Sequence, residues 1–142
     1  MAVRDTRERL QRYLTDFLDE VKVDKDGDFH FRHESVEVFA TTQEWGEDET
    51  VVHVVAPLLF GVKGSPELFE YIARHSDDYL FGHLALKDRD GTFDIHFSHI
   101  LLGDFLDPEE LKSVVAAVAI TGNDLDDALQ KQFGGERFYE DS

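Results

Sequence analysis

The hydrophobic residues of the chain recur with a helical period in three stretches. The first covers residues 5–21, where Asp5 precedes Glu8 by three positions, as in a capping box. The second begins at Ser65, a capping residue, and Pro66 takes the first helical position. Apolar residues at three- and four-residue steps give each helix one buried stripe. These stripes are Leu10, Tyr13, Leu14, Phe17, Leu18 and Val21 in the first helix, and Leu68, Phe69, Ile72 and Ala73 in the second.

The third helical stretch covers residues 108–133 and has the clearest beginning, with Asp107 as cap and Pro108 at the first position. Its apolar stripe consists of Leu111, Val115, Val118, Gly122, Leu125 and Leu129. Because the stripe keeps its phase through Gly122, it predicts one continuous helix in which the glycine lets another backbone approach. The alternative is a break at residues 121–123, since glycine costs about 1 kcal/mol of helix propensity relative to alanine.

Between the helices the hydrophobic period falls to two, which predicts strands. Phe29, Phe31 and His33 alternate with polar residues, and the turn at residues 88–91 (DRDG) is typical of a hairpin. The five predicted strands cover about residues 28–33, 36–42, 50–60, 79–86 and 92–100. The order α-β-β-β-α-β-β-α predicts an α+β domain with a five-stranded, mainly antiparallel sheet packed by helices. This domain takes up residues 1–135, and a charged tail, expected to fray, follows over 136–142.

Two of the predicted strands are apolar on both faces. Val51, Val52, Val54 and Val55 follow one another closely in the third strand, and the fourth is similar. Three helices leave part of a five-stranded sheet open, and the surplus aromatic residues point to a partner surface: Phe39, Trp45, Phe60, Tyr79 and Phe81. Such a patch commonly meets a second copy of the chain or a peptide.

Composition narrows the class of protein. A chain of 142 residues with 42% hydrophobic residues fits one domain with its own core. It has no cysteine, no secretory signal pattern and no apolar run long enough for a bilayer, so we expect a cytoplasmic protein. The 31 acidic against 14 basic residues give a net charge of −17, which disfavours nucleic acid and membrane surfaces. Such acidity serves solubility, or it suits a basic partner.

The residues do not form a recognisable catalytic or metal site. Histidines three apart on a strand point to opposite faces, so a metal would need His53, His83 and His96 to converge from different strands. Asp94, His96 and Ser98 supply the residue types of a triad, but same-face neighbours on one strand project in parallel about 7 Å apart. We therefore expect no enzyme, no cofactor and no metal.

The order of elements and four short motifs resemble the type III secretion chaperone-like proteins, including the YbjN group and its actinobacterial relatives. The motifs are residues 65–69 (SPELF), 88–93 (DRDGTF), 106–111 (LDPEEL), and 125–129 (LDDAL) with 133–135 (FGG). The likeness extends from Arg7 to Gly135, and these motifs mark the fold without carrying chemistry.

The resemblance implies a non-enzymatic, acidic homodimer that holds an extended, otherwise unfolded segment of a client protein. Its dimer seam would be the middle helix with the fourth strand, and client contacts would fall on apolar positions of the sheet. The residues expected in the seam or at the client are Leu68, Phe69, Ile72, Tyr79, Phe81, His83, Phe39 and Trp45. Two other hypotheses stay open: a regulatory domain that binds a folded partner, and a small enzyme or metal protein using His53, His83 or His96.

Overall fold

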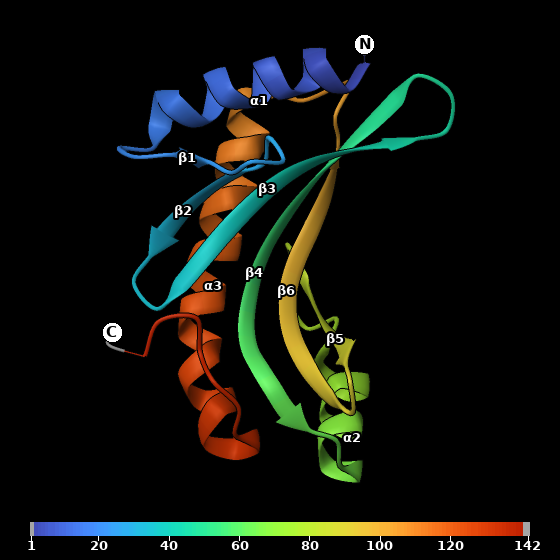
Figure 1. Cartoon of the computed structure of the whole chain (residues 1–142), viewed down its shortest axis with the longest axis vertical. Helices are drawn as coiled ribbons and strands as arrows, with labels where there is room; N and C mark the ends of the chain where they lie inside the picture. Colours follow the sequence, from blue (N-terminus) through green and yellow to red (C-terminus); the bar gives the residue numbers. More distant parts are fainter. Residues whose placement is uncertain (1, 141–142) are drawn as a thin grey trace.

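The computed structural model describes residues 2–140, with three helices and six strands in one chain (Figure 1). The helices are α1 (Ala2–Phe17), α2 (Pro66–His75) and α3 (Pro108–Phe133). The strands are β1 (Lys22–Val23), β2 (Phe29–His33), β3 (Val36–Trp45), β4 (Glu49–Lys63), β5 (His83–Arg89) and β6 (Thr92–Leu102). The α+β class and the order of the predicted elements are confirmed, and the sheet gains one short strand, β1, that the sequence pattern did not reveal.

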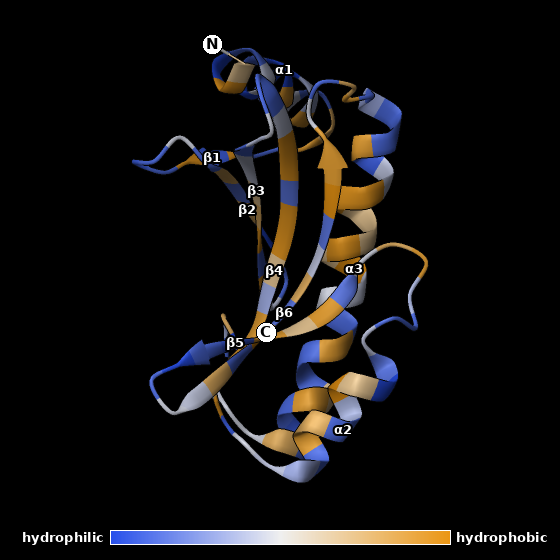
Figure 2. Cartoon of the chain, turned by 90° about the vertical axis from the view of Figure 1, so that its right-hand side faces the viewer, coloured by the Kyte–Doolittle hydropathy of each residue, from blue (hydrophilic) through white to orange (hydrophobic). Residues whose placement is uncertain are grey.

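The six strands form one sheet in the order β1-β2-β3-β4-β6-β5, and every neighbouring pair is antiparallel. Helix α3 packs along β4, β3 and β6, while α1 contacts β3, β4 and α3, and α2 lies against β5. Figure 2 shows α2 and α3 on one side of the strongly curved sheet, with α1 across its upper end. The opposite side carries no helix, and we call it the open face.

Helix α3 is continuous, as its apolar stripe predicts, and the alternative of a break at residues 121–123 is wrong. Asp107 caps it by accepting a hydrogen bond from the Glu110 amide. Gly122 lies close against the sheet. A methyl group there would lie 3.2 Å from Leu58 Cδ2 and 3.3 Å from Ala56 Cβ. Tight packing against two strand residues therefore explains why a glycine interrupts the stripe.

Helix α1 ends at Phe17, four residues before the predicted end at Val21. Asp19 and Glu20 follow, and acidic residues are unfavourable at the negative end of a helix. Leu18 and Val21 still pack against the core from the connecting segment, so the periodic pattern was real although the helix had ended. The next residues form β1, which pairs with Phe29 and His30 of β2.

The fourth predicted strand begins later than its pattern suggests, at His83 and not at Tyr79. Gly82 has φ of +98°, and a Cβ there would collide with the Phe97 ring, so a loop must precede the strand. Tyr79 belongs to this loop and packs its ring edge-on against Phe97 at 5.0 Å. The expectation that this strand is apolar on both faces is wrong, because residues such as His83 and Lys87 are exposed.

The third predicted strand, β4, has two different halves. Val52, Val54 and Ala56 are buried and alternate with half-buried residues, as on a sheet with one covered face. Beyond Pro57 the register with β6 shifts twice, and consecutive residues such as Leu58 and Leu59 are both buried. In the first half, Val51 and Val55 are half-buried on the other face from Val52 and Val54; only in the second half do β-bulges bring consecutive apolar residues into the core.

Candidate functional site

The open face is defined by strand register. Ala56 faces α3, so its neighbours Val55 and Pro57 point to the other side of the sheet. Cross-strand partners share a face, which extends the open face over five strands, β2 to β6. Its main rows are Gln43–Val51–Leu102, Thr41–His53–Ile100, Phe39–Val55–Ser98–His83 and Pro57–His96–Ala85.

The upper part of the open face is apolar and accessible. Trp45, Ile100 and Leu102 are 47%, 54% and 52% exposed, and Val51 between them is half-buried. The two flanking strands stop short here: β2 pairs with β3 as far as Ala40, and β5 pairs with β6 as far as Ser98. Residues 41–45 of β3 and 99–102 of β6 therefore have a paired strand on one side, which leaves edge positions for another strand.

The middle of the open face is polar and rich in histidine. Burial lowers the pKa of His53 from its ordinary value, and the nearby Lys87 and His83 lower it further. Burial likewise lowers the pKa of His96, with Lys87 as the next contributor. The four side chains thus lie close enough to influence one another, and the lowered pKa values of His53 and His96 favour neutral imidazoles at these two residues.

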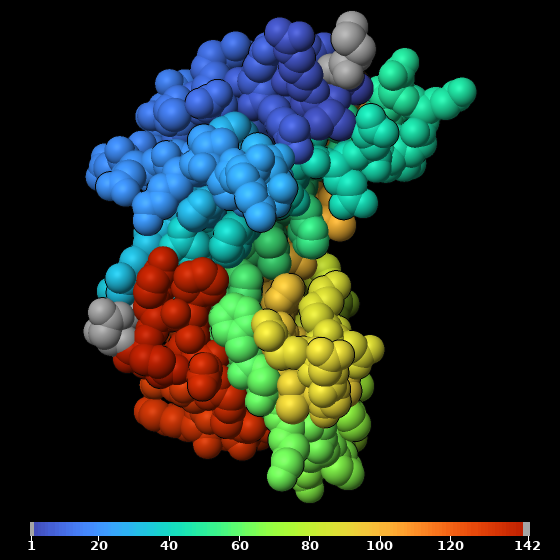
Figure 3. All heavy atoms as spheres, in the orientation of Figure 1, coloured from blue at the N-terminus to red at the C-terminus, as the bar shows by residue number. Residues whose placement is uncertain are grey.

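The lower margin of the open face is covered by the end of the chain. Phe138 packs its ring between Phe39 and Phe60, with centroid distances of 6.1 and 5.9 Å. Tyr139 donates a hydrogen bond of 2.7 Å to the buried Glu37, which also lies 2.6 Å from His30 Nδ1. Residues 136–140 of the predicted tail therefore lie on the sheet, whereas 141–142 fall outside the described residues. Figure 3 shows β4 in green exposed between this red segment and the yellow β5 hairpin.

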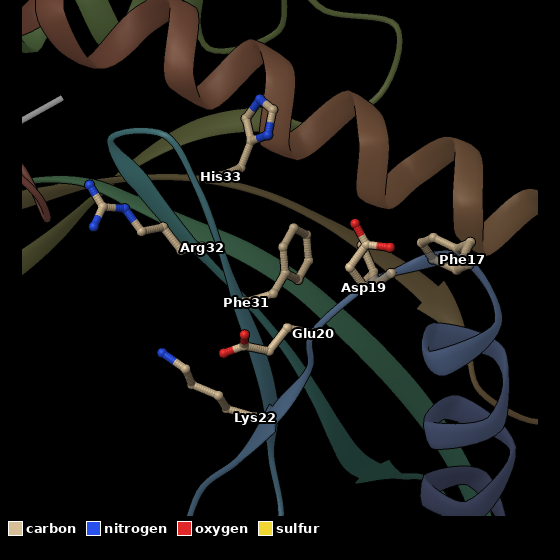
Figure 4. A pocket seen from close by; sticks show the side chains of 8 residues that line it. Phe17, Asp19, Glu20, Lys22, Phe31, Arg32 and His33 are labelled. Carbon is tan, nitrogen blue, oxygen red and sulfur yellow. The ribbon is translucent and has the colours of Figure 1, made fainter.

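A second surface lies beside β2 and is called here the α1–β2 groove. It comprises a cavity of about 480 Å³ lined by Phe17, Leu18, Asp19, Glu20, Lys22, Phe31, Arg32 and His33 (Figure 4). A second cavity of about 270 Å³ shares Phe17, Leu18, Phe31 and His33 and continues to the exposed side of α3. There it is lined by Lys112, Val115, Ala116, Ala119 and Ile120. The groove is apolar at its α3 end and charged at its β1 end.

A third, polar cavity of about 310 Å³ joins the β2–β3 turn to α3. Asp126 is buried there, and its Oδ2 forms a short hydrogen bond with Ser35 Oγ, while its Oδ1 has no hydrogen-bond partner among residues 2–140. Asn123 Oδ1 accepts a hydrogen bond from the Ser35 amide and also lies 2.6 Å from Ser35 Oγ, whose single proton can be donated to Asn123 or to Asp126 but not fully to both. Burial raises the pKa of Asp126, and the Ser35 hydrogen bond offsets this in part. The cluster attaches α3 to the sheet through polar contacts.

The predicted partner-binding residues fall into separate regions. Phe39, Trp45 and His83 lie on the open face. Phe81 packs edge-on against His99 at 5.8 Å, and Tyr79 packs on Phe97, so both belong to the helix-covered side. In the middle helix, Leu68 is fully buried and has no surface for a partner, whereas Phe69 is exposed and Ile72 half-buried.

The structure does not assemble the candidate catalytic groups. Asp94 is held by Arg89 at 2.7 Å and by the Gly61 amide; although burial opposes ionisation, these hydrogen bonds keep its pKa below the ordinary value. Ser98 is buried in its row beside His83. Among residues 2–140, no three histidine or carboxylate side chains lie close enough to hold a metal ion. Within the same range, no helix combines the length and hydrophobicity needed to cross a membrane.

The two exposed residues of β6 in the upper part of the open face, Ile100 and Leu102, were not singled out from the sequence. The signal was present, because residues 99–102 (HILL) place apolar side chains on successive positions of one strand. The third and fourth predicted strands were expected to be apolar on both faces. In the structure it is the upper half of β6, the fifth predicted strand, that carries apolar side chains on both faces, and those on the open face are large and exposed.

An accessible apolar sheet face bordered by free strand edges is typical of a domain that binds other proteins. Comparison with models of protein families identifies the family of the chain. The family model described as T3SS (YopN, CesT) and YbjN peptide-binding chaperone 1 matches residues 4–141, and the chain belongs to this family. The resemblance seen in the sequence is thereby confirmed.

Among solved structures, the chain is similar to the crystal structure of YbjN from E. coli, provisionally described as a transcription regulator. The TM-score is 0.64 at 13% sequence identity, and the match covers 89% of this chain and 93% of the YbjN chain. At this identity the likeness establishes the fold. A search of curated proteins by sequence finds no match.

Proposed function

We propose that the protein holds an extended, unfolded segment of a client protein on its open face and acts as a non-enzymatic chaperone-like protein. The observation that carries this proposal is the group of exposed apolar side chains on the open face of the sheet, namely Trp45, Ile100 and Leu102. Membership of a peptide-binding chaperone family supports it.

The free strand edges explain why the segment would be extended. Residues 99–102 of β6 continue beyond the last pair with β5, at Ser98, so their outward backbone groups can pair with an added strand. An added strand would place alternate side chains on the same side as Ile100 and Leu102. Backbone pairing would supply affinity for many sequences, and these apolar contacts would select segments with alternate apolar residues.

The proposal includes a homodimer whose seam lies near α2 and the β5 end of the sheet. Leu80, in the loop before β5, is 89% exposed. Phe81, the next residue, and Phe69 on the preceding helix α2 are also exposed. Large exposed apolar residues of this kind favour contact with another chain. Light scattering should report twice the monomer mass for the wild type and the monomer mass for Leu80→Asp. A wild-type protein with the monomer mass would contradict the dimer.

The binding site can be tested with two matched substitutions. Ile100 on the open face and Ile120 in the α1–β2 groove are 54% and 53% exposed, so Ile→Ser removes similar apolar area at each. The probe is fluorescent α-lactalbumin kept unfolded by reduction and carboxyamidomethylation. Loss of roughly half an isoleucine contact, about 1 kcal/mol, should weaken binding of this probe about fivefold in Ile100→Ser.

The control variant Ile120→Ser should bind the probe as the wild type does. The opposite result, in which Ile120→Ser weakens binding and Ile100→Ser does not, would assign the client to the α1–β2 groove. Failure of the wild-type protein to bind any unfolded probe would overturn the proposed function.

The second candidate function is a regulatory domain that binds a folded partner. The similar fold of YbjN favours it, together with the provisional description of that protein as a regulator. The net charge of −17 argues that such regulation would act through a protein and not through direct contact with DNA. A pull-down that recovers one folded protein, without binding of the unfolded probe, would favour this function.

A further inference from the structure

Charge is distributed unevenly between the open face and the rest of the molecule. The chain carries 31 acidic residues against 14 lysines and arginines. Yet four of its seven histidines point to the open face by their register: His30, His53, His83 and His96. The face that is proposed to receive the client therefore differs in charge from the acidic remainder of the surface.

Three of these histidines and one lysine form a compact group, called here the histidine patch: His53, His83, Lys87 and His96. His96 is paired with Ala85, which lies between His83 and Lys87 on the same face of β5. His83 and Lys87 are therefore diagonal neighbours of His96, and diagonal neighbours lie about 7–8 Å apart, within reach of long side chains, so the three can act on one ligand together. His53 lies further along the face and is close enough to Lys87 and His83 to feel their charge.

The carboxylates that the strands direct to the open face are already engaged or distant. Glu37 is bound by His30 and by the Tyr139 hydroxyl. Asp94 is bound by Arg89 and the Gly61 amide. Glu49 lies opposite Trp45 at the end of the β3–β4 hairpin. Asp94 also lies opposite Lys87 and borders the patch, but both of its oxygens are bound by Arg89. Among residues 2–140, no further strand carboxylate faces the patch, so its three histidines and Lys87 outnumber the acceptors beside them.

We propose that the segment held on the open face is acidic, with aspartate or glutamate side chains received by the histidine patch and apolar side chains received by Ile100 and Leu102. This inference rests on the proposed function and specifies the chemistry of the client. The overall negative charge does not prevent such binding, because at physiological salt charges farther than about 8 Å are largely screened. The nearby donors decide which segments bind.

Binding of an acidic segment would be linked to protonation of the patch. A carboxylate beside an imidazole favours the charged form, so the complex takes up protons and becomes tighter as the pH falls from 8 to 6. The charged or titratable groups facing the patch are His53 from β4, His83, Lys87 and Arg89 from β5, and Asp94 and His96 from β6. Glu136, paired with Phe60, lies at the lower margin of the face. Asp94 remains bound to Arg89 and is ionised across this pH range.

The test uses two fluorescent ten-residue peptides and the full-length protein. One peptide alternates glutamate with valine and threonine, and the other has lysine in place of each glutamate. At pH 6 the glutamate peptide should bind about tenfold more tightly than the lysine peptide, and its affinity should fall severalfold at pH 8. The variant His83→Gln, Lys87→Gln, His96→Gln should reduce the preference to within about twofold.

A matched control removes two histidines and one lysine elsewhere, as His33→Gln, His75→Gln, Lys112→Gln, and should keep the preference. Equal affinity for both peptides, tighter binding of the lysine peptide, or a preference that survives in the patch variant would overturn this proposal. If unfolded α-lactalbumin binds and neither peptide does, the proposal falls and the proposed function stands. If α-lactalbumin also fails to bind, the proposed function itself falls.

Discussion

Substitution of Gly122 tests how closely α3 packs on the sheet. A Cβ at this position would lie 3.2 Å from Leu58 Cδ2 and 3.3 Å from Ala56 Cβ, whereas carbon atoms pack best at about 3.5–4.0 Å. Ala56 cannot shift easily, because it lies within β4 and is paired with Phe97 of β6. Helix α3 itself would therefore have to move. Overpacking of this kind costs about 1–3 kcal/mol.

Helix propensity acts in the opposite direction and sets the net result. Replacing glycine gains about 1 kcal/mol for alanine and about 0.4 kcal/mol for valine. Gly122→Ala should therefore stay within about 1 kcal/mol of the wild type, while Gly122→Val, with two further carbons, should lose about 2 kcal/mol. The loss corresponds to a Tm about 6 °C lower for a chain of this size.

Urea unfolding followed by circular dichroism measures these differences. Ala128→Val, at an exposed position of α3, is the control for propensity and should lose only about 0.6 kcal/mol. A Gly122→Val protein as stable as the wild type would refute the close packing of α3 on β4.

Three further predictions concern buried polar groups. Asp126→Asn should raise the free energy of unfolding by about 1 kcal/mol at pH 7.5, because burial disfavours the charged carboxylate, and the gain should shrink as the pH falls and the carboxyl becomes protonated; a gain that does not depend on pH, or destabilisation at pH 7.5, would contradict it. Tyr139→Phe removes the hydrogen bond to Glu37 and should cost about 1–2 kcal/mol in urea unfolding, against no change if the segment is loosely attached. The lowered pKa values of His53 and His96 mean that the unfolded chain takes up protons near pH 6.5 before the folded protein does, so stability should fall below that pH. His96→Gln should reduce the fall, and identical pH slopes would contradict this.

The elements with the strongest local signals were predictable from the sequence. The cap at Asp107 and the in-phase stripe of α3 gave a helix whose bounds, Pro108–Phe133, the structure confirms. The role of Gly122 followed from the same stripe, because a glycine in phase with apolar residues marks close approach of another backbone. Local periodicity and capping decide such elements before tertiary contacts act.

The errors arose where tertiary contacts override the local pattern. Tyr79 continues an apolar alternation, but its ring packs on Phe97 from a loop, and Gly82 turns the chain before β5 begins. The two residues of β1 are too few for a periodic signal, and they pair because β2 lies beside them. Bulges in β4 brought Leu58 and Leu59 to the core together, which a regular strand would not do.

The proposed binding surface was only partly predictable. Phe39 and Trp45 lie on the open face, but Ile100 and Leu102 gain their exposure because β5 pairs with β6 only as far as Ser98. The length of a neighbouring strand is a property of the folded sheet and is not written in the residues of β6. For the same reason the histidine patch appears only when β4, β5 and β6 are aligned.

Amide hydrogen exchange of the protein, with and without unfolded α-lactalbumin, tests most directly whether the client binds on the open face. Binding on the open face predicts new protection in residues 49–57 of β4 and 98–102 of β6, with the free edge of β6 showing the largest change. Helix α3 should exchange as before. Protection confined to residues 17–33, along the α1–β2 groove, would contradict the claim that the client lies on the open face.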